Sequence, residues 1–336
     1  MRRTSSGRSQ ANCCKQSVME VFVDPYACES WCADPRPKPH LNELERAIYS
    51  TIAYRDVFDF APEIDEIHRY LHWIKCGRND VAQALARGPL VKEHLTTDGR
   101  FFALKGRERI LGSRLERRAL GEKHWPNALR YARFLANLPH VRMVGLTGTF
   151  AADNFAPGGD IDFILLTDAG AMWRARALAR TAAFVSRKFG TGMLCPNTFL
   201  SLTTLALPRE SLYDAHELAQ IVPLFGHGAY EALRRANSWS ETYLPNAQRA
   251  PETSRAFDRL SRPRLKSLVE WGSNSFAGRC AEELEALRNM RRFNRGTRFK
   301  GWTLTTRERH SFRESMKQDI EKAWRLRLEA LEAGGG

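Results

Sequence analysis

The most constraining feature of the sequence is a pair of apolar segments separated by a short polar gap. Residues 141–146 read VRMVGL, and residues 160–167 read DIDFILLT. Short apolar runs bounded by turn residues predict buried strands, and the second run is apolar enough to lie in the centre of a sheet. We therefore expect one strand that ends at Gly148 and Thr149 and another that begins at Asp160.

Two aspartates stand at the start of the second strand. Residues two apart in a strand face the same side, so Asp160 and Asp162 place their carboxylates together while Ile161 turns into the core. Paired carboxylates are ligands that suit Mg²⁺, which completes its shell with water and phosphate oxygens. Gly148 lets the backbone approach a phosphate closely, and Thr149 can donate hydrogen bonds to it. The segment thus predicts Asp160 and Asp162 as magnesium ligands beside a phosphate-binding turn.

At these residues the sequence resembles the DNA polymerase β-type nucleotidyltransferase superfamily. The family signature is a hydrophobic residue, a glycine, a glycine or serine, a gap, and then Asp-hydrophobic-Asp-hydrophobic. Gly148, Asp160 and Asp162 match it, whereas Thr147 and Thr149 depart mildly from it. The resemblance implies Mg²⁺-dependent transfer of a nucleoside monophosphate from an NTP to an acceptor, with release of pyrophosphate. The two aspartates would be the catalytic metal ligands.

The same family normally supplies a third carboxylate from a later strand. The corresponding strand here is expected over 194–207, which contains no aspartate or glutamate. Asn197 stands at a suitable place and could coordinate a cation, but an amide cannot accept a proton as a base does. Either Asp153, Asp214 or Glu217 replaces the missing group, or catalysis is weak or absent.

Two arginines follow the aspartate strand on a helix predicted over 169–189. Arg176 and Arg180 share a face at i, i+4 spacing. Because arginine contacts phosphate in a bidentate manner, they are candidate ligands for the triphosphate. A solvated helix face is the alternative interpretation.

The region before this domain has the order of a winged helix-turn-helix. Helices are expected over 41–60, 64–74 and 80–87, and short alternating segments flank Asp98-Gly99, a strong hairpin signal. Such a module could bind DNA, or it could serve only for packing or protein contacts.

Strands that alternate with helices predict an α/β class for the central region. A helix is expected over 107–138 with an interruption at Pro126, and another helix over 208–245. The resemblance implies that this region has a nucleotidyltransferase-type α/β fold with a small mixed sheet and flanking helices. The expected parts are a disordered leader (1–40), the winged-helix module (41–105), the nucleotidyltransferase domain (106–246) and a basic helical extension (247–336), with helices over 264–292 and 311–333.

The net charge of +14 favours polyanionic partners, so nucleic acid is a candidate partner of the winged helix and the basic extension. The chain lacks the roughly 20 uninterrupted apolar residues of a membrane span. The first residues are basic without the apolar core of a secretory signal. These features predict a cytoplasmic protein.

Segments ERAIY, DVFDF, DIDF and ELAQIVPL also resemble a bacterial group that joins a winged helix to this domain, over about residues 41–246. That group brings no substrate with it. The main hypothesis is nucleotidyl transfer to an unknown acceptor, small or macromolecular. The rival is a DNA-binding regulator whose degenerate domain only senses nucleotide, and a third option is an RNA-modifying enzyme recruited by the basic extension.

Overall fold

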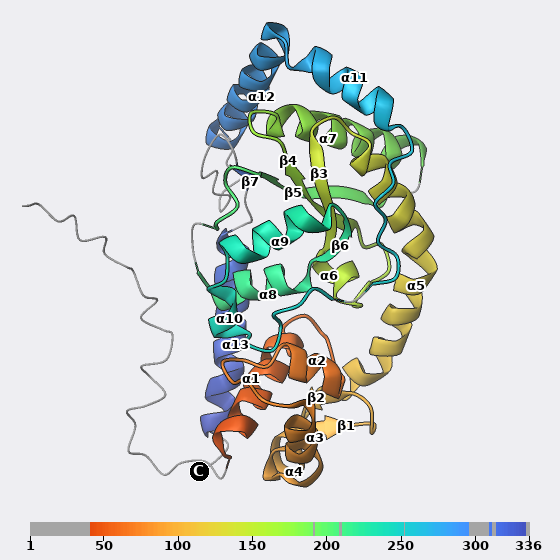
Figure 1. Cartoon of the computed structure of the whole chain (residues 1–336). Coiled ribbons are helices and arrows are strands. Elements are labelled where there is room, and N and C mark those ends of the chain that lie inside the picture. The colour runs from red at the N-terminus through yellow and green to blue at the C-terminus, as the bar shows by residue number, and fades with distance from the viewer. Residues whose placement is uncertain are drawn as a thin grey trace, which may run out of the picture. The chain divides into compact units, whose positions relative to one another are not determined.

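The fold was obtained as a computed structural model (Figure 1). It describes residues 41–190, 192–207, 210–251, 253–295, 309–310 and 314–333, so the expected leader over 1–40 lies outside the described residues. Internal contacts group Lys38–Gly336 into one compact unit. The separate domains expected from the sequence therefore stay a prediction.

Four helices and a hairpin open the described chain. They are α1 (Glu43–Asp56), α2 (Ile64–Arg69), α3 (Arg78–Arg87), α4 (Pro89–His94), β1 (Leu95–Thr97) and β2 (Phe102–Leu104). Asn42 begins α1 through a capping box with Glu45. The hairpin predicted at Asp98-Gly99 is confirmed, because β1 and β2 pair antiparallel around a turn in which Gly99 has φ +92°. Helix α2 ends five residues earlier than expected, and α4 was not predicted.

The last described helix, α13 (Glu314–Ala333), packs on this helical region. Leu331 is buried in the same apolar cluster as Ile48 and Ile52 of α1, with Trp324 partly buried against it. The indole of Trp324 donates a hydrogen bond to the carbonyl of Ser50. The C-terminal end of the chain therefore helps to stabilise its first described helix.

A small mixed sheet forms the centre of the molecule, as the sequence predicted. Its strands are β3 (Val141–Thr147), β4 (Ile161–Thr167), β5 (Leu194–Ser201), β6 (Val222–Phe225) and β7 (Arg309–His310), in the order β6-β3-β4-β5-β7. Strands β4 and β5 are parallel, and the other pairs are antiparallel.

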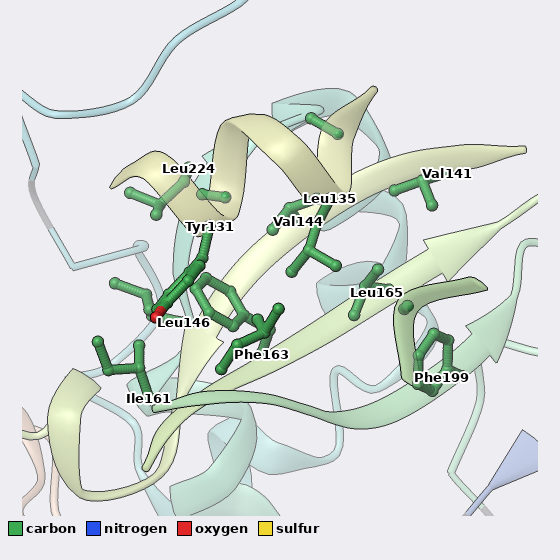
Figure 2. Packing of buried hydrophobic residues seen from close by; sticks show 14 of the residues in the cluster. Tyr131, Leu135, Val141, Val144, Leu146, Ile161, Phe163, Leu165, Phe199 and Leu224 are labelled. Carbon is green, nitrogen blue, oxygen red and sulfur yellow. The ribbon is translucent and has the colours of Figure 1, made fainter. Parts of the chain in front are cut away.

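Each face of the sheet is covered by its own helices. On one face, α5 (Arg109–Ala136) and α7 (Met172–Phe189) bury a large apolar cluster, in which Figure 2 shows Tyr131 beside Leu146 and Phe163, and Leu135 beside Val144. On the other face, α8 (Leu212–Gln220) and α9 (His227–Ala236) cover a cluster that contains Ile164. Alternate residues of β4 thus enter different cores.

The predicted interruption at Pro126 is wrong, because α5 runs through it as one helix of 28 residues. Both ends of α5 are anchored: Ile110 and Leu111 pack with Phe101 of the hairpin region, and Leu135 packs on the sheet. These contacts outweigh the roughly 3 kcal/mol that an internal proline costs an isolated helix.

The helix expected over 208–245 is also wrong in its middle, where strand β6 separates α8 from α9. Pro223 lies in this strand, and proline is tolerated there because β6 is an edge strand of the sheet. Gly226 follows with φ +76° and turns the chain into α9. A third helix, α10 (Ser240–Tyr243), completes the region.

The helix expected over 264–292 is divided into α11 (Pro263–Ser273) and α12 (Phe276–Arg295).

Among the helices that the structure describes, none combines the length and the apolarity that crossing a bilayer requires.

We expect Phe163→Ala to lower the free energy of unfolding by about 3–5 kcal/mol, because Phe163 is fully buried in the cluster of Figure 2. Phe184→Ala on α7 is the matched control, since Phe184 is 67% exposed and should change stability little. Chemical denaturation of both variants measures the difference. Equal losses for the two variants would contradict the assignment of this core.

Candidate active site

The predicted metal strand and the predicted phosphate turn meet at one end of the sheet. Thr147, the last residue of β3, is paired with Asp162, the second residue of β4. Ile161 and Phe163 are buried in the α5/α7 core, and Ile164 belongs to the α8/α9 cluster. Because side chains alternate along a strand, Asp162 faces the side of the sheet that carries α8.

Gly148 brings the turn directly against Asp162. Its φ of +67° lies in the left-handed region, and a Cβ placed on it would come within 2.6 Å of the Asp162 carboxylate oxygen Oδ2. Both facts require glycine at this position. Gly148 starts the single-turn helix α6 (Gly148–Ala151), and Thr149 is exposed on it. The turn and the carboxylate therefore form one continuous surface.

Asp160 lies just before β4 and is half-exposed. Its negative charge raises the pKa of Asp162, which indicates that the two carboxylates are close enough to repel each other. Arg187, near the end of α7, forms an ion pair with Asp160 at 3.8 Å between two exposed side chains. Such an exposed pair holds little energy, so a ligand could displace the arginine. The sequence did not single out Arg187.

The pKa of the Asp162 carboxyl group is raised above its usual value. Burial raises its pKa to about 6, a hydrogen bond with Cys195 lowers it, and the charge of Asp160 raises it further. Burial, the largest cause, disfavours the ionised carboxylate, and the charge of Asp160 adds repulsion, so ionisation is favoured by a positive counter-charge. A divalent cation would supply that counter-charge, and oxygen donors from two carboxylates are those that Mg²⁺ prefers. The residues present therefore fit a magnesium ion.

Cys195, and not Asn197, stands opposite Asp162 on β5. The register of β4 with β5 shifts between Phe163 and Ile164, whose partners are Pro196 and Thr198, so Asn197 falls in the shift. Burial, followed by the charge of Asp162, raises the pKa of the Cys195 thiol to about 12. The thiol is therefore protonated at neutral pH. Asn197 as a metal ligand stays a prediction.

Asp153, Asp214 and Glu217 were the candidates for the missing third carboxylate. Of these, Glu217 interacts with both Thr147 and Asp162. It comes from α8, and its Oε2 lies 3.5 Å from the hydroxyl of Thr147, at the limit of a hydrogen bond. Burial raises the pKa of Glu217 to about 7, and the charges of Asp214 and Asp162 raise it further. Glu217 thus has a pKa close to neutral pH and lies on α8, which covers the same face of the sheet as Asp162.

The other two candidates have different partners. Asp214 is buried, accepts a hydrogen bond from Ser211 at 2.8 Å and forms an ion pair with Lys317 of α13 at 2.6 Å. Asp153 follows α6 with φ +54°, and its carbonyl accepts a hydrogen bond from Arg114 at 2.6 Å. Asp214 acts on the site only through its charge on Glu217.

The two arginines predicted for the triphosphate lie in different surroundings. Arg176 is buried and donates a hydrogen bond to Asn289 of α12 at 2.8 Å, so it holds two helices together. Arg180 is exposed, and its positive charge lowers the pKa of Cys195, which places it near the site. Of the two, Arg180 remains available to a nucleotide, and the role of Arg176 stays an untested prediction.

A second acidic cluster has a structural role. Within the described part of the chain, one group of three potential metal ligands has donor atoms within 4.8 Å of one another, namely His140, Asp168 and Glu270. Arg142 already bridges the two carboxylates, with contacts of 2.5 Å to Asp168 and 2.8 Å to Glu270. A cation would have to compete with this guanidinium. The cluster instead holds α11 against β3.

Comparison with protein-family models, with curated proteins and with solved structures finds no match to this chain.

We expect Gly148→Ala to destabilise the protein by more than the roughly 1–2 kcal/mol that placing a residue with a Cβ in the left-handed region costs by itself. The new methyl group would also push the Asp162 carboxylate, 2.6 Å away, out of position. Thermal melting checks the loss of stability. Gly158→Ala, at φ +75° with open space around its Cβ position, is the control for the backbone cost alone. If the two variants lose equal stability, the close approach to Asp162 is contradicted.

Glu217→Gln is expected to stabilise the metal-free protein at pH 8. The folded-state pKa of Glu217 is raised from 4.5 to about 7, so its stabilising contribution is fully present below pH 4.5 and is lost as the pH rises through 7. Glutamine removes the buried charge that forms above this range. We expect a Tm gain of at least about 1–2 °C at pH 8, because about 1 kcal/mol shifts the Tm of a chain of 150–250 residues by about 2–4 °C and that of this longer chain by less.

The gain should shrink as the pH falls to 4.5, where the wild-type carboxyl is protonated. Melting curves across this pH range measure it, with the exposed Glu116→Gln on α5 as the control. A Tm difference that does not change with pH would show that Glu217 is not a raised-pKa group.

Proposed function

We propose that the protein is a Mg²⁺-dependent nucleotidyltransferase that transfers a nucleoside monophosphate from an NTP to an acceptor hydroxyl or similar group. The observation that supports this best is the closeness of Gly148 to Asp162: a left-handed glycine lies under a carboxylate, at the junction of two central strands. This arrangement supports the proposal because a turn suited to phosphate and a carboxylate suited to a metal ion lie next to each other. The small mixed sheet with helices on both faces is consistent with the proposed nucleotidyltransferase fold.

Each residue has a proposed role. Gly148 leaves room for a phosphate at the start of α6, where helix amides have no partner within the helix. Thr149, exposed beside it, binds phosphate oxygens through its hydroxyl. Arg180 and the loosely paired Arg187, both on α7, interact with Cys195 and Asp160 through their charge, and they orient the triphosphate. Asp160 and Asp162 would hold Mg²⁺, which when bound neutralises phosphate charge that builds up during transfer.

Glu217 is the proposed general base. A base works best when its pKa is close to the operating pH, and the pKa of Glu217 is about 7. In its ionised form it would take the proton from the attacking group of the acceptor, while the pyrophosphate leaves. This assigns the third carboxylate to a helix that faces the sheet and not to the neighbouring strand, where Cys195 stands.

The α1–α3 helices followed by the β1–β2 hairpin are proposed to be a winged helix. Two arginines of this module form exposed ion pairs within the protein: Arg78 pairs with Asp65, and Arg100 pairs with Glu63 at 3.2 Å. Packing of α13 on α1 further ties this module to the rest of the chain. Its proposed role is therefore to support the enzyme, with nucleic-acid binding as the alternative.

The position of Cys195 opposite Asp162 favours the regulatory alternative. A protonated thiol opposite Asp162 can neither bind Mg²⁺ as a carboxylate does nor act as a base near neutral pH. If Glu217 does not act in its place, the domain would bind NTP and Mg²⁺ without chemistry, as a nucleotide sensor.

The test is an assay with each of the four α-³²P-labelled NTPs and Mg²⁺, in which a deproteinised cell extract provides the pool of acceptors. The wild type should release pyrophosphate and transfer label to an acceptor. Asp162→Ala and Asp160→Ala should abolish both, and Glu217→Gln should slow transfer by about 100-fold, the usual contribution of a general base. Asp258→Asn, an exposed aspartate of a distant loop, is the control that should keep activity.

A filter-binding measurement with the same NTPs separates the hypotheses. NTP binding that requires Mg²⁺, without pyrophosphate release, would support the sensor. Absence of NTP binding by the wild type would contradict both functions.

A further inference from the structure

Helix α11 is oriented with its polar side toward the protein. Lys266 is buried and donates hydrogen bonds to the carbonyls of Ala136 and Val141, at 2.8 and 2.6 Å. Glu270 accepts hydrogen bonds from the backbone of His140 and from the guanidinium of Arg142. The helix is therefore attached to the end of α5 and the start of β3 by polar contacts.

The opposite side of α11 is apolar and exposed. Leu268 is 63% exposed and Trp271 is 79% exposed, and Leu265 and Val269 are exposed with them. A surface helix normally buries its apolar stripe and exposes its polar one. Helix α11 does the reverse.

Helix α12 has the same inverted arrangement. Glu282 accepts hydrogen bonds from the backbone amides of Trp173 and Arg174 and so caps the start of α7. Asn289 accepts the hydrogen bond from Arg176. Its outward side presents apolar residues at helical spacing, namely Phe276, which is 75% exposed, with Leu284 and Leu287. Figure 1 shows the two helices joined as a pair beyond α7, at the end of the molecule away from α1–α4.

We infer that the outward face of α11 and α12 binds the surface of a lipid bilayer that contains anionic lipids. The exposed residues that make this face are Leu265, Leu268, Val269, Trp271, Phe276, Leu284 and Leu287. Apolar helix faces with an aromatic residue insert into the boundary between headgroups and acyl chains. Exposed apolar faces of this extent mark interaction sites.

The charge on this pair of helices determines the kind of bilayer. Arg262, Arg264, Arg279 and Arg291 are exposed on or next to the apolar face and outnumber the exposed Glu283 of α12, while Glu270 and Glu282 point into the protein. The exposed charge is thus basic and complements anionic headgroups. Single-stranded nucleic acid fits less well, because most residues of the face are aliphatic and cannot stack on bases. The inference does not depend on nucleotidyl transfer.

The test is co-sedimentation of the full-length protein with vesicles of phosphatidylcholine alone and of phosphatidylcholine with phosphatidylglycerol at a 3:1 ratio. We expect binding to the anionic vesicles that weakens as salt is added. Leu268→Glu and Phe276→Glu should each weaken it at least tenfold. Leu326→Glu on α13, where the leucine is 56% exposed, is the matched control and should bind as the wild type does.

Several results would overturn the inference. These are absence of binding to anionic vesicles, equal binding by wild type and both face variants, or equal binding to neutral vesicles. A concentration-dependent dimer in light scattering that both face variants abolish would identify a second copy of the chain as the occupant instead. If a glutamate variant does not melt cooperatively, Leu268→Ser and Phe276→Ser replace it, with the same tenfold criterion.

Discussion

The pairing of Thr147 with Asp162 is the constraint on which the site depends. It joins the last residue of one central strand to the second residue of the next, so that the chain must reverse beside a carboxylate. Only glycine satisfies both the backbone conformation and the space at position 148. The same pairing fixes Asp162 on the α8 face, opposite the α5/α7 core, and thereby brings Glu217 within its electrostatic reach.

The helices outside the sheet are attached by polar groups as much as by apolar ones. Lys266 and Glu282 each satisfy backbone groups at the end of another element, which explains how α11 and α12 stay in place without burying their apolar sides. Helix α13 differs, because it buries Leu331 and Trp324 against α1 and supplies Lys317 to Asp214. The basic extension thus has two parts. Helix α13 stabilises the helical region, whereas α11 and α12 keep their apolar sides exposed.

The elements that were predicted correctly are those whose signal is local. Strands β3 and β4 and the hairpin at Asp98-Gly99 are visible because apolar runs and turn residues alternate over a few positions. Strand β6 was missed because a four-residue edge strand with Pro223 between two helices has no periodicity of its own. The path of α5 through Pro126 depends on tertiary packing, which no local pattern shows.

The site was predictable only in part, because some of its residues are brought together by tertiary packing and not by local spacing. Asp160, Asp162 and Gly148 lie within one short segment, so spacing alone brought them together. The choice among Asp153, Asp214 and Glu217 depended on how α8 packs on the sheet. The pairing of β4 with β5 puts Cys195 opposite Asp162, and a register shift beyond this pair leaves Asn197 between two paired residues, which a count of residues along the strand could not reveal.

The central claim is tested most directly by a crystal structure with Mn²⁺ and a non-hydrolysable NTP analogue, recorded at a wavelength where manganese scatters anomalously. The account predicts an anomalous peak at coordination distance from both Asp160 and Asp162, with phosphate density against Gly148. A peak only at the His140, Asp168 and Glu270 cluster, or nucleotide density away from that glycine, would contradict it.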